Sequence, residues 1–180
     1  MTFPEAYIQY LVHFHGDRDF FECHELLEDH WKQYDNRDRD SVWVGLIQLA
    51  VSLYHYRRKN IVGGIKMMDK AIINVKKNIV FLTTLKIDTE DLLKQMNHVL
   101  IRMKNRDDYL NMNIRITDEE LLRICQKRCI QLGFQWGILK DFNNEYIINR
   151  HLLRDRTGIE VERYVSSLTK KFERKQSVYI

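Results

Sequence analysis

The side chains most able to do chemistry lie in residues 20–31, where apolar residues recur at helical spacing. On a helix, His24 falls near Trp31 on the apolar side, and Glu28 follows one turn later. Side chains four residues apart on a helix are neighbours, so we expect His24 and Glu28 to form an imidazole–carboxylate pair at the margin of the core. Such a pair can ligate a metal ion or satisfy its own hydrogen bonds. Glu25 is expected to point the other way, towards solvent.

A second polar stripe interrupts the otherwise apolar residues 41–59. Its members recur at steps of 3, 4 and 3 and so share one narrow helix face: Gly45, Gln48, Ser52 and His55. A buried glutamine or histidine left unpaired costs ~1–3 kcal/mol, so this stripe needs polar partners. The nearest ones along the chain are His24 and Glu28. We therefore expect the two stripes to face each other, with Gly45 permitting close approach of the helices.

The first hypothesis for these side chains is structural. A hydrogen-bonded polar cluster would fix the register of the two helices, as most buried histidines do in cores. Its members would be His24, Glu28, Gln48, Ser52 and His55. The protein would then act through its surface, as an interaction or regulatory module with a protein partner or a second copy of itself. This is the function that the sequence favours.

The alternative hypothesis is a metal-dependent hydrolase. Two imidazoles and one carboxylate, from His24, His55 and Glu28, form a workable set of ligands for a divalent ion. The ion would activate a bound water, with Glu25 or Gln48 acting as a base or orienting a ligand. The spacing of His24 and Glu28 differs from the two-histidine zinc motif, so the third ligand has to come from another helix.

A third and weaker hypothesis is nucleic-acid binding through basic residues near the carboxyl terminus. Eight of them could contact phosphates: Arg150, Arg154, Arg156, Arg163, Lys170, Lys171, Arg174 and Lys175. Acidic residues are interspersed among them, and no recognition-helix motif accompanies them. A solvated helix face is the preferred interpretation, and nucleic acid is not expected as a partner.

These side chains must be positioned by helices, because the chain is poor in proline and glycine and its apolar residues recur at helical spacing. The periodic stretches predict helices over residues 2–15, 20–34, 41–59, 61–82, 88–103, 117–133 and 157–172. Residues 110–116 instead alternate between apolar and polar, which predicts an extended segment with one buried face. Its expected partners are residues 134–136 or 146–148.

The expected fold is therefore all-α, with two parts. Residues 1–105 form a helical bundle centred on the helix of residues 41–59, since four or five consecutive helices pack naturally in this way. Residues 106–180 form a smaller carboxy-terminal lobe that contains the short extended segment.

The motif residues also carry a resemblance to a known family. The run from His24 to Glu28, which reads His-Glu-Leu-Leu-Glu, precedes Trp31 and is followed by residues 45–50 and by His55. This combination resembles the bacterial and archaeal family called domain of unknown function 309, over roughly residues 15–80. The resemblance implies a compact helical fold in which the His-Glu-Leu-Leu-Glu signature is suspected of functional importance. It implies no activity, substrate or cofactor.

Composition excludes several other classes. The 180 residues include 29 lysines and arginines against 25 aspartates and glutamates, with 44% hydrophobic residues, as in a globular domain. The longest apolar run, residues 42–54, falls short of the ~20 residues of a membrane-spanning helix. Because the amino terminus has no basic leader followed by an apolar stretch, the protein is expected to be cytoplasmic.

Overall fold

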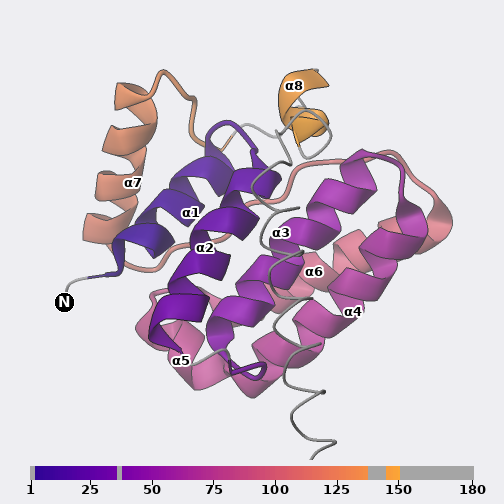
Figure 1. Ribbon diagram of the computed structural model, residues 1–180, viewed down its shortest axis with the longest axis horizontal. Coiled ribbons are helices and arrows are strands. Elements are labelled where there is room, and N and C mark those ends of the chain that lie inside the picture. The colour runs from indigo at the N-terminus through magenta and orange to yellow at the C-terminus, as the bar shows by residue number, and fades with distance from the viewer. Residues whose placement is uncertain (1–2, 36–37, 138–144, 151–180) are drawn as a thin grey trace, which may run out of the picture. The chain divides into compact units, whose positions relative to one another are not determined.

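The computed structural model describes residues 3–35, 38–137 and 145–150 (Figure 1). Its helices are α1 (Glu5–His15), α2 (Phe20–Tyr34), α3 (Val42–Arg57), α4 (Ile61–Lys77), α5 (Ile79–Thr84), α6 (Thr89–Asn105), α7 (Glu119–Gln131) and α8 (Glu145–Ile148). The described residues contain no strand, and a single antiparallel bridge joins Ile87 to Ile116. The predicted all-α fold is confirmed. Among these residues, no helix is long and apolar enough to cross a membrane.

The chain divides into two compact units, Met1–Ile148 and Asn149–Ile180. The first unit includes the segment after residue 105 and helix α7, and the division expected at residue 105 stays a prediction. The helix predicted over residues 157–172 lies outside the described residues, as do the basic residues beyond Arg150.

Helix α3 is the centre of the bundle. It packs between α2 and α4, while α6 covers α4, and α1 packs on both α2 and α7 (Figure 1). Apolar side chains surround α3 because it has neighbours on several sides, and Leu46, Leu49 and Leu53 are fully buried. Tyr10 on α1 secures this arrangement by donating its hydroxyl proton to the carbonyl oxygen of Leu46, at 3.1 Å.

The polar stripe of α3 faces α4, and the expectation that it faces α2 was wrong. A Cβ atom added to Gly45 would lie 2.5 Å from Oδ1 of Asn74 on α4. Ser52 Oγ donates to the carbonyl oxygen of Gly64, at 2.7 Å. Gly45 does permit a close approach, but the approaching helix is α4.

Two helix ends also differ from the prediction. The single helix expected over residues 61–82 breaks at Asn78, whose Nδ2 donates to the carbonyl oxygens of Asn74 and Asp40. The helix expected over residues 41–59 ends at Arg57, and Lys59 has a left-handed conformation, with φ of 59°. Asn60 begins α4, because its Oδ1 accepts from the amide of Gly63 at 3.1 Å.

The predicted extended segment of residues 110–116 is irregular and buries Met112 and Ile114. Its expected partners, residues 134–136 and 146–148, do not pair with it as strands. The end of α1 holds it instead: His15 Nε2 accepts from the amide of Ile114 at 3.0 Å. Arg18 Nη1 donates to the carbonyl oxygen of Met112 at 2.9 Å. Side chains replace the missing strand because irregular buried backbone still needs hydrogen-bond partners.

Candidate metal site on helix α2

Helix α2 positions the residues of the predicted site. Asp19 caps its amino end, because Oδ1 of Asp19 accepts from the amide of Glu22 at 3.0 Å. The face that packs on the core buries Phe20, Cys23 and Leu27. His24 follows Cys23 directly, so it lies at the edge of the buried face, as the sequence predicts.

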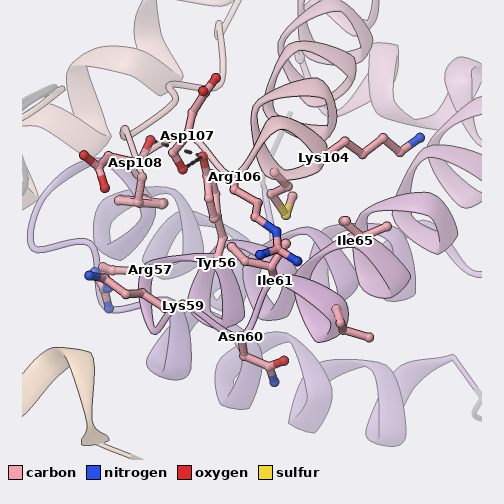
Figure 2. A pocket seen from close by; sticks show the side chains of 13 residues that line it. Tyr56, Arg57, Lys59, Asn60, Ile61, Ile65, Lys104, Arg106, Asp107 and Asp108 are labelled. Carbon is pink, nitrogen blue, oxygen red and sulfur yellow. Dashed lines mark hydrogen bonds between the residues drawn. The ribbon is translucent and has the colours of Figure 1, made fainter.

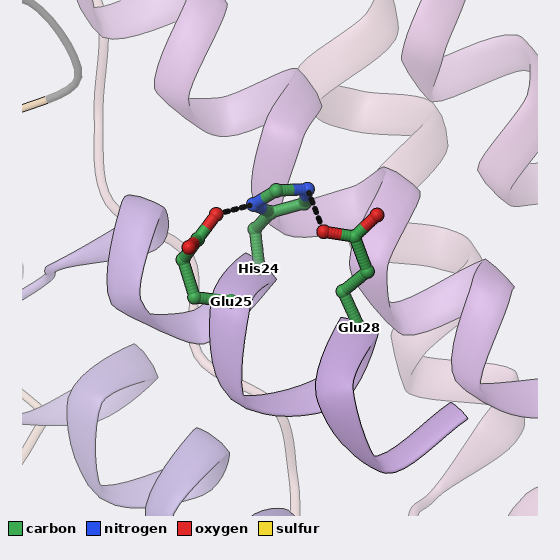
Figure 3. Close-up of side chains that lie close together, drawn as sticks. All are labelled: His24, Glu25 and Glu28. Carbon is green, nitrogen blue, oxygen red and sulfur yellow. Dashed lines mark ion pairs between the residues drawn. The ribbon is translucent and has the colours of Figure 1, made fainter. Parts of the chain in front are cut away.

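His24 lies between two carboxylates (Figure 3). Its Nδ1 is 3.1 Å from Oε1 of Glu25, and its Nε2 is 3.6 Å from Oε2 of Glu28. The three side chains are 26%, 28% and 31% exposed for His24, Glu25 and Glu28. The expectation that Glu25 points away was wrong. Adjacent helix positions diverge by about 100°, but the glutamate side chain is long enough to turn back to the ring.

A neutral imidazole has one N–H donor and one acceptor nitrogen. It can donate to only one of the two carboxylates, and its acceptor nitrogen then faces the other carboxylate without a proton between them. Two conditions remove this conflict. Either the ring carries both protons, or a cation lies between the acceptor nitrogen and the carboxylate.

The three residues offer the chemistry of a metal site. One ligand atom from each of His24, Glu25 and Glu28 lies within 4.8 Å of the other two. One imidazole and two carboxylates suit Zn²⁺ or Mn²⁺. Because the carboxylates contact opposite edges of the ring, one ion can use only one ring nitrogen, and one glutamate has to rotate towards it.

Two neighbours shape the site further. Lys32 Nζ lies 3.2 Å from Oε1 of Glu28, so an ammonium group already occupies one side of that carboxylate. The ring of Phe21 lies 6.1 Å from the ring of His24 and shields one side of it. A bound ion would therefore lie partly open to solvent and would compete with Lys32 for Glu28.

The structure does not bring the other predicted residues to this site. His55 Nδ1 is 3.1 Å from Nδ2 of Asn60, and burial followed by the charge of Arg58 lowers its pKa. Ser52 bonds to the backbone of α4, as described above. Gln48 Oε1 is buried and has no hydrogen-bond partner among the described residues. His24 and Glu28 pair only with residues of α2 in that part of the chain.

Two buried residues of structural importance were not singled out from the sequence. His15 and Arg18 are each 1% exposed and bind the segment of residues 110–116. Their sequence signal is weak, because a histidine near a helix end and an arginine in a turn are usually solvated. The amide and carbonyl groups that bind them lie about a hundred residues further along the chain.

The candidate metal site lies in a region of the chain that matches a known protein family. The family model described as "Domain of unknown function (DUF309)" matches residues 7–67, which include α2 and α3. The chain is 39% identical over 161 residues to the uncharacterized protein YpuF of Bacillus subtilis (strain 168), covering 89% of this chain and 92% of that protein. It is 28% identical over 57 residues to an uncharacterized protein of Aquifex aeolicus (strain VF5), covering 32% of this chain and 17% of that protein. No solved structure matches. Neither relative's name states an activity, so the function has to be argued from the side chains.

Proposed function

The chain belongs to the DUF309 family, and from that premise we propose that it is an interaction module whose α2 face binds a divalent cation. The ligands are His24, Glu25 and Glu28. The observation that carries the proposal is the position of His24 between two carboxylates, 3.1 Å from Glu25 and 3.6 Å from Glu28. A cation resolves the conflict that a neutral ring has with two acceptors.

The partial exposure of the three side chains supports binding to a partner. Side chains from one turn of a single helix cover only one side of an ion. The remaining coordination positions take water, or a carboxylate from a protein partner or a second copy of this chain. The ion would then join the α2 face to the surface of the partner.

A metal-dependent hydrolase has less support. That alternative needs His55 as a third ligand, and His55 contacts Asn60 instead. If Glu25 serves as a ligand, it is not available as the base that hydrolysis requires. The geometry therefore favours cation binding without catalysis.

Isothermal titration of Mn²⁺ and Zn²⁺ into chelator-treated full-length protein tests the proposal. We expect one ion per chain in the wild type, and a loss of binding of at least tenfold in His24→Ala and Glu28→Gln. Asp29→Asn is the matched control, because Asp29 is an exposed carboxylate on the same helix outside the group of three. Absence of binding in the wild type, or equal loss in Asp29→Asn, would overturn the proposal. Circular dichroism checks that each variant folds.

A further inference from the structure

A cleft of about 720 Å³ opens where three helix ends meet (Figure 2). Its walls are the end of α3, the beginning of α4, and the end of α6 with the residues that follow it. No residue of α2 lines it, so it is distinct from the candidate metal site. Its volume falls within the ~300–1,000 Å³ range of small-molecule sites.

The charges of the cleft favour an anion. Four basic residues and two acidic ones line it, and without Lys104, which points away from it, the excess is one positive charge: Arg57, Lys59, Lys104, Arg106, Asp107 and Asp108. Asp107 is partly neutralised, because its Oδ2 lies 3.9 Å from Nη1 of Arg102. Lys59 and Arg106 are exposed, and neither side chain has a hydrogen bond or ion pair within the part of the chain that the structure describes. In Figure 2 Arg106 extends towards the side of the cleft where Ile61 lies, whereas Lys104 points away.

The beginning of α4 adds to the positive potential. Ile61 and Val62, in the first turn of this 17-residue helix, line the cleft. Amides of a first turn lack carbonyl partners within their own helix, and the helix dipole places partial positive charge there. Phosphate groups bind at helix amino ends for this reason.

Arg57 adds a fixed positive charge to the wall of the cleft. It lines the cleft and is only 8% exposed. Its Nη1 donates to the carbonyl oxygen of Arg18 at 2.8 Å and its Nη2 to that of Ile147 at 3.5 Å, and its guanidinium lies 5.0 Å from the centre of the Phe20 ring. Its Nε is buried and has no hydrogen-bond partner among the described residues. Because this atom is closed off from the cleft, Arg57 would attract an anion through its charge and not through a direct bond from Nε.

Part of the remaining wall is apolar. Ile61 and Ile65 line the cleft and are partly exposed, whereas Met103 is fully buried. A ligand that carries only charge would leave the two isoleucines in contact with water. A ligand with both a charged group and a ring or apolar portion matches the whole lining.

We propose that this cleft binds a phosphorylated small molecule. Its phosphoryl oxygens would contact Arg106, Lys59 and the beginning of α4, and its ring or apolar portion would contact Ile61 and Ile65. A small molecule is favoured over a nucleic acid because the positive charge is gathered around one cleft. A phosphate polymer would instead need a row of phosphate contacts along the surface.

Glycine substitutions test this proposal without disturbing the backbone. Lys59 and Arg106 have φ of 59° and 60°, a left-handed conformation that glycine adopts without strain. Lys59→Gly and Arg106→Gly therefore remove a positive charge and are expected to fold at least as well as the wild type. Lys86→Gly is the matched control, because Lys86 has φ of 63° and does not line the cleft.

The probes are pyrophosphate, ADP and a single-stranded 20-nucleotide DNA, titrated calorimetrically into the full chain. We expect ADP to bind at least threefold more tightly than pyrophosphate. We expect Arg106→Gly to weaken both at least tenfold, because it removes a charge-assisted hydrogen bond, and Lys86→Gly to leave both unchanged. The proposal is overturned if neither probe binds, if Lys86→Gly weakens binding as much as Arg106→Gly, or if the DNA binds more tightly than ADP.

Discussion

Two histidines nine residues apart in the sequence have opposite surroundings. His15 is 1% exposed and both of its ring nitrogens meet the backbone, whereas His24 is 26% exposed and both of its nitrogens meet carboxylates. A neutral His15 with its proton on Nδ1 donates to the carbonyl oxygen of Leu11 at 2.8 Å and accepts from the amide of Ile114 at 3.0 Å. The carbonyl oxygen of Ile114 also lies 3.1 Å from Nε2, but the amide supplies the donor that this nitrogen needs. His24 meets two acceptors and needs further positive charge, so the less buried histidine is the one suited to bind a cation.

The surroundings of His15 form a buried polar seam, which we define as His15, Arg18 and the segment of residues 110–116. Arg18 donates to the carbonyl oxygens of Phe14 and Met112, at 2.6 and 2.9 Å. It also donates to Oδ1 of Asn113, at 2.7 Å. The ring of His15 stacks on Trp136, with 4.2 Å between ring centres. The seam attaches the irregular segment to α1 and serves stability.

Arg18→Met is expected to cause the largest loss of stability in the buried polar seam. The substitution leaves two carbonyl oxygens and one amide oxygen of the seam without their donor, and breaking a buried charged network costs ~3–5 kcal/mol. Urea denaturation should show that loss in the free energy of unfolding. Lys86→Met is the control, because both residues are left-handed, with φ of 60° for Arg18 and 63° for Lys86. The control should lose less than ~1 kcal/mol, and equal losses would show that the seam contributes nothing.

A second effect is expected from acid. Burial, reinforced by the charge of Arg18, lowers the pKa of His15 from 6.5 to about 4, although its backbone contacts oppose the change. Between pH 6.5 and 4, the unfolded chain therefore binds a proton at His15 that the folded chain does not bind. The contribution of neutral His15 to the free energy of unfolding is fully present above pH 6.5. It is lost as the pH falls towards 4, and the loss amounts to about 3 kcal/mol. The other titrating histidines are present in both proteins, so the difference between wild type and His15→Gln isolates this group.

Urea midpoints of wild type and His15→Gln between pH 4 and 7 measure it. The variant should be less stable at pH 7, and the gap should narrow on acidification. Parallel pH profiles would contradict the assignment of His15 as the acid-sensitive group of the seam.

The sequence predicts the parts of the molecule that follow from local pattern. The helical fold, the position of α2 and the His24–Glu28 pair all depend on residues a few positions apart, where helix geometry fixes the spacing. The partner of the α3 stripe could not be predicted, because several helices compete for that face. Gly64 and Asn74 on α4 meet it in the structure.

The errors at the site have the same origin. Glu25 was placed by the direction of its Cα–Cβ bond, whereas its carboxylate lies at the end of three rotatable bonds. His55 was given a role in the metal site by the phase of α3, yet it lies at the carboxyl end of that helix, where Asn60 of the following turn reaches it. Side-chain rotation and helix-end contacts are decided by tertiary packing, which spacing alone does not encode.

The smallest effect, expected from His24→Ala, distinguishes the group on α2 from the buried polar seam around His15. In the presence of EDTA, His24→Ala should change the free energy of unfolding by less than ~1 kcal/mol, because its partners are partly exposed and such ion pairs contribute little. His15→Ala should cost ~2–3 kcal/mol under the same conditions, since it removes two buried hydrogen bonds. With Mn²⁺ at a hundred times its Kd, the wild type should gain ~2.7 kcal/mol and His24→Ala should gain nothing. If His24→Ala costs as much as His15→Ala in EDTA, the group on α2 is structural, because only a side chain that holds the fold together loses that much stability with no ion present.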